Sequence, residues 1–229
     1  MNNIKIKDIE TERLMIKVTT MNEQEQLWNI VRDEKVNKYY FPTPDRIFNK
    51  YNLSKDKVDD LLKAREIFQG QLNDWERQRP FYEKKIIDIH NGENSQKFTW
   101  SIFLKDGTLI GQMTVQPSEL YPNNPEIRDV GWYVDPKFHN KGYATEFAKA
   151  ILDFMFNEVE IEKILTSAAT NNPGSWKIME KLGFTYTGNK PFIYLDDNNN
   201  FVDCSCYSIT KEEYTKTKIK LKNYKNDNN

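Results

Sequence analysis

The chain has 229 residues, and its 33 Lys and Arg against 34 Asp and Glu give a formal net charge of -1. This balance gives no overall electrostatic reason to bind nucleic acid or an acidic membrane surface, so we expect neither as a partner. No stretch approaches the roughly 20 apolar residues that a bilayer span requires. The first residues lack the apolar core of a secretory signal, and we therefore expect a cytoplasmic protein.

The cysteines and histidines do not follow a metal-site pattern. Cys204 and Cys206 are separated by one residue, where a disulfide would be strained, so we expect both to be reduced. The two histidines, His90 and His139, are far apart and have no Cys/His/Asp cluster at ligand spacing. We therefore expect no metal site.

The first half of the chain begins with a clear strand and helix. Alternating apolar residues predict a strand over 11–19, and Thr20 with Glu23 forms a capping box that opens a helix. Helical periodicity then fails over 33–52, which is aromatic and broken by prolines. We expect this stretch to be irregular.

A long helix is expected next, over 54–79, and Pro80 should end it. Segment 81–97 is ambiguous between a short strand and a loop. Together, 33–97 form an enlarged helical region added to an otherwise compact sheet domain, which we expect to span 1–214. The remaining residues, 215–229, form a polar, Lys-rich tail that we expect to be frayed.

The second half has stronger local signals. Strands are expected over 98–104, 108–116, 127–134, 163–169 and 202–210, and helices over 142–157 and 174–182. Asp106-Gly107 indicates a hairpin turn, and Gly183 fits the position after a helix end. This order of elements predicts a mixed α/β fold, with helices crossing between the later strands of a mixed sheet.

The segment Val134–Glu146 combines a strand end, a short loop and a helix start. The first amides of a helix have no intrahelical acceptors and carry partial positive charge. Gly142 and Ala144 leave room for an anion, most plausibly a pyrophosphate, to reach them, and Lys141 adds charge. The alternative is a glycine at an ordinary helix start.

A second segment, Asn172–Phe184, follows the strand expected over 163–169. Together the two segments resemble the GNAT superfamily of acyl-CoA N-acyltransferases. The family's pyrophosphate loop falls on His139, Asn140, Lys141, Gly142, Tyr143 and Ala144. Its later Asn-x-x-Ser and Glu-Lys-x-Gly-Phe elements fall on Asn172, Ser175, Glu180, Lys181, Gly183 and Phe184. Residues 10–14 and 207–214 resemble the branch that acetylates N-termini of ribosomal proteins and small amines.

The resemblance implies a twisted, largely antiparallel mixed sheet flanked by helices, with acetyl-CoA as the donor. It implies direct transfer of the acetyl group to a primary amine in a ternary complex. The amine belongs either to a protein N-terminus or to a small molecule. The residues expected to bind the cofactor are Trp132, Tyr133, Val134, the loop from His139 to Ala144, Thr145, Asn172 and Ser175. A backbone N–H near Trp132 to Val134 should polarise the thioester carbonyl.

The sequence departs from the family at two positions. His139 replaces the Gln or Arg of the loop, and Met179 stands where many members carry a tyrosine that protonates the leaving thiolate. Ser175, or a water that it holds, is the substitute we expect. The candidates for the general base are Asp129 and Glu126. The alternative is that Asp129 is only a solvated charge on the strand.

The acceptor site is expected in 33–97. Five aromatic residues there could line an acceptor pocket or simply form the core of their helices: Tyr39, Tyr40, Trp75, Phe81 and Tyr82. The main alternative to the enzyme is a catalytically idle acyl-CoA-binding or sensing module, because of the missing tyrosine and the altered loop. We expect a monomer or a homodimer.

Overall fold

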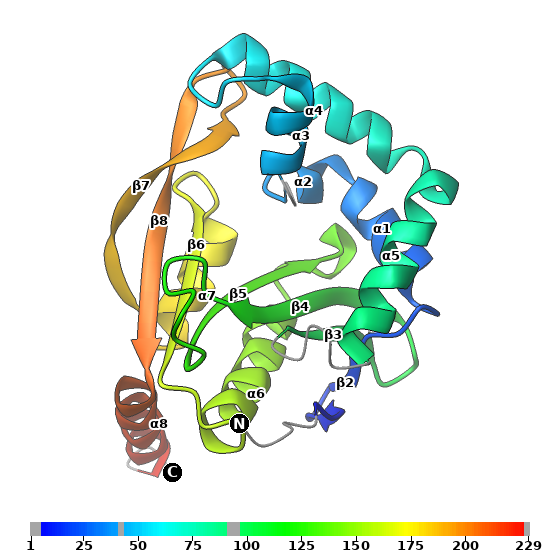
Figure 1. Ribbon diagram of the computed structural model, residues 1–229. Helices are drawn as coiled ribbons and strands as arrows, with labels where there is room; N and C mark the ends of the chain where they lie inside the picture. The colour runs from blue at the N-terminus through cyan, green and yellow to red at the C-terminus, as the bar shows by residue number, and fades with distance from the viewer. Residues whose placement is uncertain (1–5, 41–43, 91–96, 227–229) are drawn as a thin grey trace.

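The computed structural model describes residues 6–40, 44–90 and 97–226 (Figure 1). These contain one eight-stranded sheet in the order β1-β2-β3-β4-β5-β6-β8-β7. The strands are β1 (Ile9–Glu10), β2 (Leu14–Val18), β3 (Phe98–Leu104), β4 (Leu109–Pro117), β5 (Ile127–Val134), β6 (Lys163–Ala169), β7 (Thr185–Leu195) and β8 (Phe201–Thr210). β5 and β6 pair in parallel, and the other neighbours pair antiparallel. The expected mixed, largely antiparallel sheet is confirmed.

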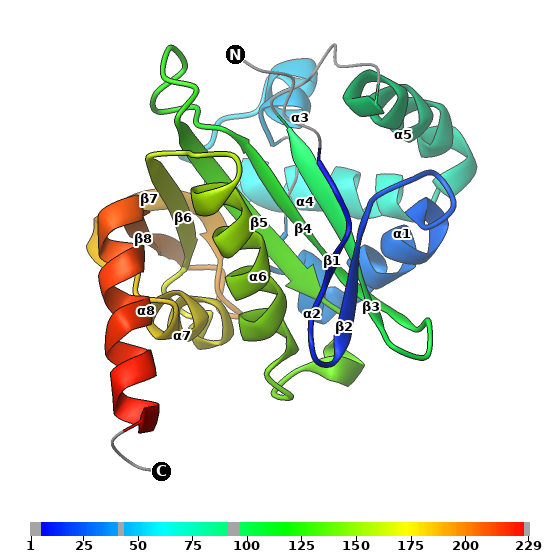
Figure 2. The ribbon, with the colours of Figure 1, turned by 90° about the horizontal axis from the view of Figure 1, so that it is seen from below.

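Helices cover both faces of this sheet. They are α1 (Gln24–Arg32), α2 (Glu34–Asn37), α3 (Pro44–Tyr51), α4 (Val58–Leu72), α5 (Trp75–His90), α6 (Tyr143–Asn157), α7 (Pro173–Lys181) and α8 (Lys211–Asn226), with a 3-10 turn over Pro136–Phe138. One core lies between the sheet and α6, α7 and α8, which Figure 2 shows on the same side. A second core lies between α1–α4 and the opposite face, where it includes Leu109 and Tyr133.

The elements with strong local signals form as expected. β5 has the predicted bounds, and α6 and α7 begin and end within one residue of the predicted ones. Gly107, in the hairpin turn, and Gly183, after α7, have φ of +89° and +88°. Both therefore adopt the left-handed conformation that favours glycine.

Residues 33–52, expected to be irregular, instead contain α2 and α3. The side chain of Asp33 accepts a hydrogen bond from the Lys35 N–H at 2.9 Å and so caps the first turn of α2. Pro44 is the first residue of α3, a position where its missing N–H costs no hydrogen bond. Capping chemistry outweighs the weak periodicity here.

The single helix expected over 54–79 is two helices, because Asp74 starts a new one. Its carboxylate accepts a hydrogen bond from the Arg77 N–H, and its carbonyl accepts one from the Gln78 N–H, both at 3.2 Å. Pro80 lies inside α5 and does not end it, and the helix continues to His90. The expectation of a strand or loop over 81–90 is therefore wrong.

The tail is also more ordered than expected, since α8 extends through it. Glu213 accepts hydrogen bonds from the Thr210 N–H and hydroxyl at 2.8 and 3.0 Å, which closes a capping box. Tyr214 is 3% exposed and stacks on Phe156 with ring centroids 5.1 Å apart. Its hydroxyl donates to the Lys149 carbonyl of α6 at 3.2 Å, so α8 is docked through one aromatic anchor.

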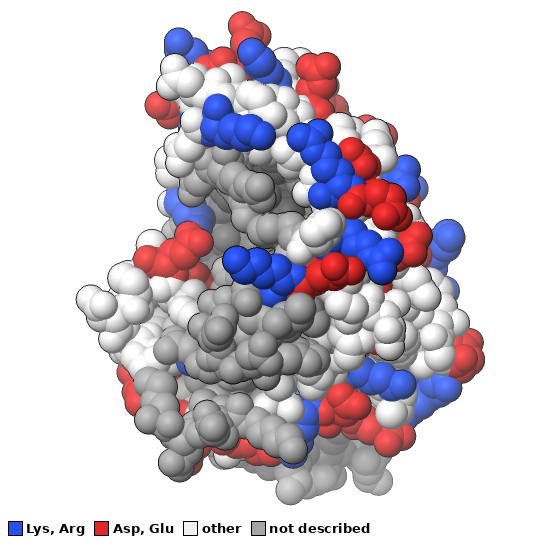
Figure 3. Space-filling view, turned by 45° about the vertical axis from the view of Figure 1, so that its right-hand side comes forward, with Lys and Arg blue, Asp and Glu red and all other residues white. Residues whose placement is uncertain are grey.

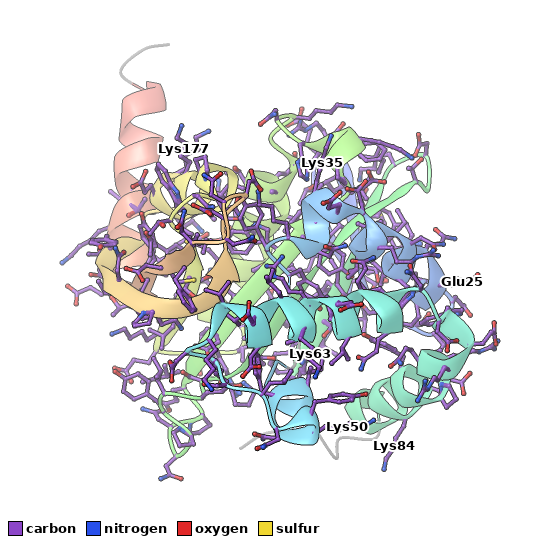
Figure 4. The ribbon with its side chains drawn as sticks, turned by 90° about the horizontal axis from the view of Figure 1, so that it is seen from above. Glu25, Lys35, Lys50, Lys63, Lys84 and Lys177 are labelled. Atoms are coloured by element: carbon purple, nitrogen blue, oxygen red, sulfur yellow. The ribbon has the colours of Figure 1, made fainter. Side chains whose placement is uncertain are left out.

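Charges on the surface are mixed. Figure 3 shows acidic and basic side chains interleaved over one face, without a large area of a single sign. On the outer side of the helical layer, Lys50, Lys63 and Lys84 are exposed to solvent (Figure 4). No helix in the described part of the chain is both long enough and apolar enough to cross a bilayer.

The docking of α8 gives a test of stability. Tyr214→Ala should lower the free energy of unfolding by about 3–5 kcal/mol, because it removes a buried aromatic ring. Ile219→Ala, on the same helix but 54% exposed, should change it by less than about 0.5 kcal/mol. Urea unfolding followed by circular dichroism measures both, and similar small changes would show that Tyr214 is not the anchor.

Candidate active site

The central feature of the site is the short ladder between β5 and β6. Only three residue pairs join the two strands, from Ile127–Lys163 to Asp129–Leu165, although β5 continues to Val134. Beyond them the Thr166 hydroxyl donates to the Val130 carbonyl at 3.0 Å. Within the described residues, the last part of this β5 edge has no partner strand.

The direction of the backbone groups shows which amides this edge presents. The Val130 carbonyl points toward β6, whereas the Asp135 N–H points toward β4, where it donates to the Ile110 carbonyl at 2.8 Å. Successive residues of a strand alternate in direction. The N–H groups of Trp132 and Val134 therefore face the unpaired edge, which is where a polarising amide was expected.

The loop after β5 leads directly into the N-terminus of α6. Asn140 and Gly142 have φ of +60° and +80°, conformations that Asn and Gly adopt most readily. The first α6 bond runs from the Glu146 N–H to the Gly142 carbonyl at 3.1 Å, and Gly142 has no side-chain cap. The N–H groups of residues 143–145 are thus free of intrahelical acceptors.

His139 stabilises this loop from within. Its Nε2 lies 2.8 Å from the Val134 carbonyl, so that nitrogen carries the proton and donates. This bond joins the loop to the end of β5. Lys141 places its ammonium 5.1 Å from the ring of Phe138, and its carbonyl accepts a hydrogen bond from Arg13 Nη1 at 3.0 Å.

These features fit the pyrophosphate of a coenzyme A. Such a ligand needs several N–H groups on one concave surface with no bulky side chain between them. The α6 N-terminus provides the amides, and a Cβ on Gly142 would lie 3.4 Å from Arg13 Nη2 in a strained conformation. The residues present therefore match the expected cofactor loop, with the β5 edge beside it for an extended arm.

Asn172 and Ser175 lie together at the start of α7. Asn172 Nδ2 donates to Ser175 Oγ at 3.2 Å, and the Ser175 N–H donates to the Asn172 carbonyl at 3.1 Å. Met179, at the family's tyrosine position, is 1% exposed and belongs to the core beneath α6 and α7. This position provides no proton donor.

The two candidate bases occupy different places on β5. Asp129 forms the last β5–β6 pair, whereas Glu126 precedes the strand and its carbonyl accepts from the Glu162 N–H at 2.9 Å. Burial raises the pKa of Asp129 above its ordinary value, partly offset by hydrogen bonds from the Ser118 hydroxyl and the Glu119 N–H. Of the two, only Asp129 lies next to the unpaired edge.

Two of the predicted acceptor residues join the helical region to the site. The Tyr39 hydroxyl donates to the Asn171 carbonyl at 3.1 Å, beside Asn172. Tyr40 packs edge-on against Tyr133 of β5 with ring centroids 5.1 Å apart. Because alternate residues share a face, Tyr133 lies on the same face of the sheet as Asp129.

Trp75 and Tyr82 lie deeper in the helical layer. Both pack on Trp28, at centroid distances of 5.5 and 5.3 Å. Burial and the nearby phenols raise the pKa of Tyr82 and Tyr133, and burial raises that of Tyr40 to about 12. These phenols therefore stay neutral at physiological pH. Phe81, the fifth predicted residue, lies outside the described side chains.

Sequence reasoning missed one contact of the loop, the one made by Arg13. The opening Glu-Thr-Glu-Arg-Leu was noted only as a branch signature. In the structure Arg13 pairs with Glu146, 133 residues away. The sequence shows Arg13 within residues 10–14 and Glu146 in the first turn of α6. No local pattern indicates that the two side chains meet.

Comparisons with known proteins identify the family and the fold. The acetyltransferase (GNAT) domain family matches residues 13–185. The uncharacterized N-acetyltransferase YnaD of Bacillus subtilis is 30% identical over 135 residues, which are 57% of this chain and 74% of YnaD. Several further Bacillus subtilis relatives are matched over 52% to 58% of their length.

Two solved structures show the same fold. The ribosomal-protein-S5-alanine acetyltransferase of Vibrio fischeri superposes with a TM-score of 0.60 at 15% identity, over 91% of this chain and 99% of that one. The spermidine N-acetyltransferase of Vibrio cholerae, solved with CoA and spermine, superposes with a TM-score of 0.61 at 15% identity, over 90% and 99%.

The cofactor loop can be tested with a matched pair of glycine variants. Gly142→Ala and Gly107→Ala both place a side chain at positive φ, so each should cost about 1–2 kcal/mol of stability. At roughly 100 times Kd, acetyl-CoA should raise the unfolding temperature of wild type and Gly107→Ala by about 5–10 °C. Gly142→Ala should lose most of this shift. Equal shifts in the two variants would place the cofactor elsewhere.

Proposed function

This chain belongs to the GNAT acetyltransferase family, and we propose that it transfers the acetyl group of acetyl-CoA to a primary amine by direct attack in a ternary complex. The observation that carries the proposal is the unpaired β5 edge, which leads into the open N-terminus of α6. Acetyl-CoA supplies the activated thioester. The chain itself must polarise the carbonyl, accept a proton from the amine and protonate the thiolate.

Polarisation falls to the backbone of β5. An N–H of Trp132 or Val134 is fixed by the β4–β5 ladder on its other side, so it needs no reorganisation to donate to a carbonyl oxygen. Such preorganised donors contribute most where water is excluded. The residues named for cofactor binding at the sequence level fit this arrangement, with His139 anchoring the loop to β5.

Asp129 is the base that we propose. It lies on the same face of the sheet as Tyr133, whose ring packs on Tyr40 of the helical region, where the acceptor was expected. Three residues, roughly 10 Å of strand, separate it from Trp132. The proton therefore passes to Asp129 through intervening water.

Ser175 is the group that we propose for the thiolate. It is half-buried at the first turn of α7, and Asn172 Nδ2 donates to its oxygen. Because Asn172 donates to the oxygen, the Ser175 hydroxyl keeps its own proton available for donation. It donates to the leaving sulfur directly or through one water.

The acceptor is a primary amine, from either a protein N-terminus or a small molecule. The phenols of Tyr40 and Tyr133 stay neutral at physiological pH, so neither places a charge beside the acceptor amine. The Vibrio relatives, named for a ribosomal protein alanine and for spermidine, supply one candidate of each kind. Met179 keeps a second function open, that of an idle acyl-CoA-binding module, which would bind CoA without releasing thiol from acetyl-CoA.

The base is tested with Asp129→Asn against Glu126→Gln. Asp129→Asn should lower kcat/KM by about 100-fold or more, and Glu126→Gln by less than about threefold. Thiol release with a panel of polyamines, amino acids and peptides measures both. Equal activity in Asp129→Asn would remove Asp129 as the base, and no turnover by wild type on any amine would favour the idle module.

The pH dependence of activity and the unfolding temperature of Asp129→Asn support the same test. A general base must be ionised, and burial raises the pKa of Asp129 above the ordinary aspartate value of 3.8. As the pH is lowered, wild-type activity should therefore fall at a pH above 3.8. A raised pKa in the folded state also means that the charged form opposes folding as the pH rises through it. At neutral pH, Asp129→Asn should therefore unfold at the same or a higher temperature than wild type.

A further inference from the structure

A cluster of contacts joins the opening segment of the chain to the first turn of α6. The Thr11 hydroxyl and the Arg13 N–H donate to Glu146 Oε1 at 2.6 and 3.0 Å. Arg13 Nε and Nη2 both lie 2.6 Å from Glu146 Oε2. Glu146 thus accepts four donors, three of them from one residue.

The same guanidinium also reaches the cofactor loop. Its Nη1 donates to the Lys141 carbonyl at 3.0 Å, and the group lies 4.7 Å from the centre of the Tyr143 ring. Gly142, between these two residues, has its Cβ position 3.4 Å from Arg13 Nη2. Arg13 therefore contacts Lys141 and Tyr143, the two residues on either side of Gly142.

The bond to Lys141 fixes the direction of the next amide. In a planar trans peptide the C=O of one residue and the N–H of the next point in opposite directions. Because Arg13 holds the Lys141 carbonyl on its own side, the Gly142 N–H points away from Arg13. It is therefore free to donate to a ligand on the side of the loop opposite Arg13.

The Arg13–Glu146 pair holds the loop backbone in place but adds almost no net charge. Burial of Glu146 raises its pKa, but the hydrogen bonds from Thr11 and Arg13 outweigh burial and hold the pKa below its usual value. Glu146 therefore stays ionised and compensates the charge of Arg13. A simple electrostatic attraction between Arg13 and an anion is largely cancelled.

We propose that Arg13 and Glu146 are positioning residues that hold the Lys141–Tyr143 backbone in the conformation that binds the pyrophosphate of coenzyme A. This inference rests on the proposed function, since it assumes that coenzyme A binds at this loop. The two residues act through the backbone and do not themselves need to contact the ligand.

Glu146→Gln separates positioning from charge. If charge alone mattered, removing a carboxylate near the pyrophosphate would strengthen CoA binding. Positioning requires the opposite, a loss of about tenfold, which corresponds to about one charge-assisted hydrogen bond. Arg13→Lys keeps the charge but not the planar fork, and it should lose affinity to a similar extent. Glu83→Gln, which breaks the exposed Arg79–Glu83 pair on α5, is the matched control.

Isothermal titration with CoA and with pantetheine gives the readout. Pantetheine lacks the pyrophosphate, so its affinity should be unchanged in all variants. A parallel loss for pantetheine would mean that the pair supports the whole fold, and it would overturn the proposal. Unchanged CoA affinity in both Glu146→Gln and Arg13→Lys would overturn it as well, with the proposed function intact. Failure of wild type to bind CoA would instead refute the proposed function.

Discussion

The parting of two parallel strands is the constraint on which the rest of this structure depends. β5 is paired along β4, and β6 along β8, but the two strands share only three residue pairs. A strand edge without a partner leaves backbone groups that must find other acceptors or donors. Thr166 satisfies the Val130 carbonyl and His139 satisfies the Val134 carbonyl. The N–H groups of the same edge are left to water or to an extended ligand, so the fold itself provides the binding surface.

Local signals predicted the part of the chain from β5 to α7 well. β5 stops at Asp135-Pro136, and α6 starts after Gly142, because proline and a left-handed glycine act on the backbone within a few residues. The helical region and α8 were predicted poorly, because their helices depend on caps and tertiary contacts that weak periodicity does not reveal. Pro80 predicts a helix end, but Asp74 caps a new helix a few residues earlier and Pro80 lies inside it. The order of α8 depends on Tyr214 meeting Phe156, a tertiary contact that no local pattern contains.

The site residues also divide into those set by local geometry and those set by tertiary contacts. The open amides before α6 were predictable, because their availability is determined by local geometry at Gly142. The properties of the site's side chains could not be predicted in the same way. The raised pKa of Asp129 depends on burial beside Ser118 and Glu119, and the packing of Trp75 and Tyr82 on Trp28 depends on how three helices meet. Arg13 shows the limit most clearly, since its partner Glu146 is 133 residues away.

The two faces of β5 pack against different sets of helices. Val130 and Val134 belong to the core beneath α6 and α7, whereas Tyr133 belongs to the core beneath the helical region. One strand therefore connects the core beneath α6 and α7 to the aromatic residues of the helical region. Tyr39 adds a second connection, from the helical region to Asn171 at the end of β6. The rest of the helical region packs on this face through the second core, which includes Leu109, Ala169 and Val202, so substitutions at Tyr39 and Tyr40 can alter the residues beside β5 while that core, the loop and the β5 edge stay as they are.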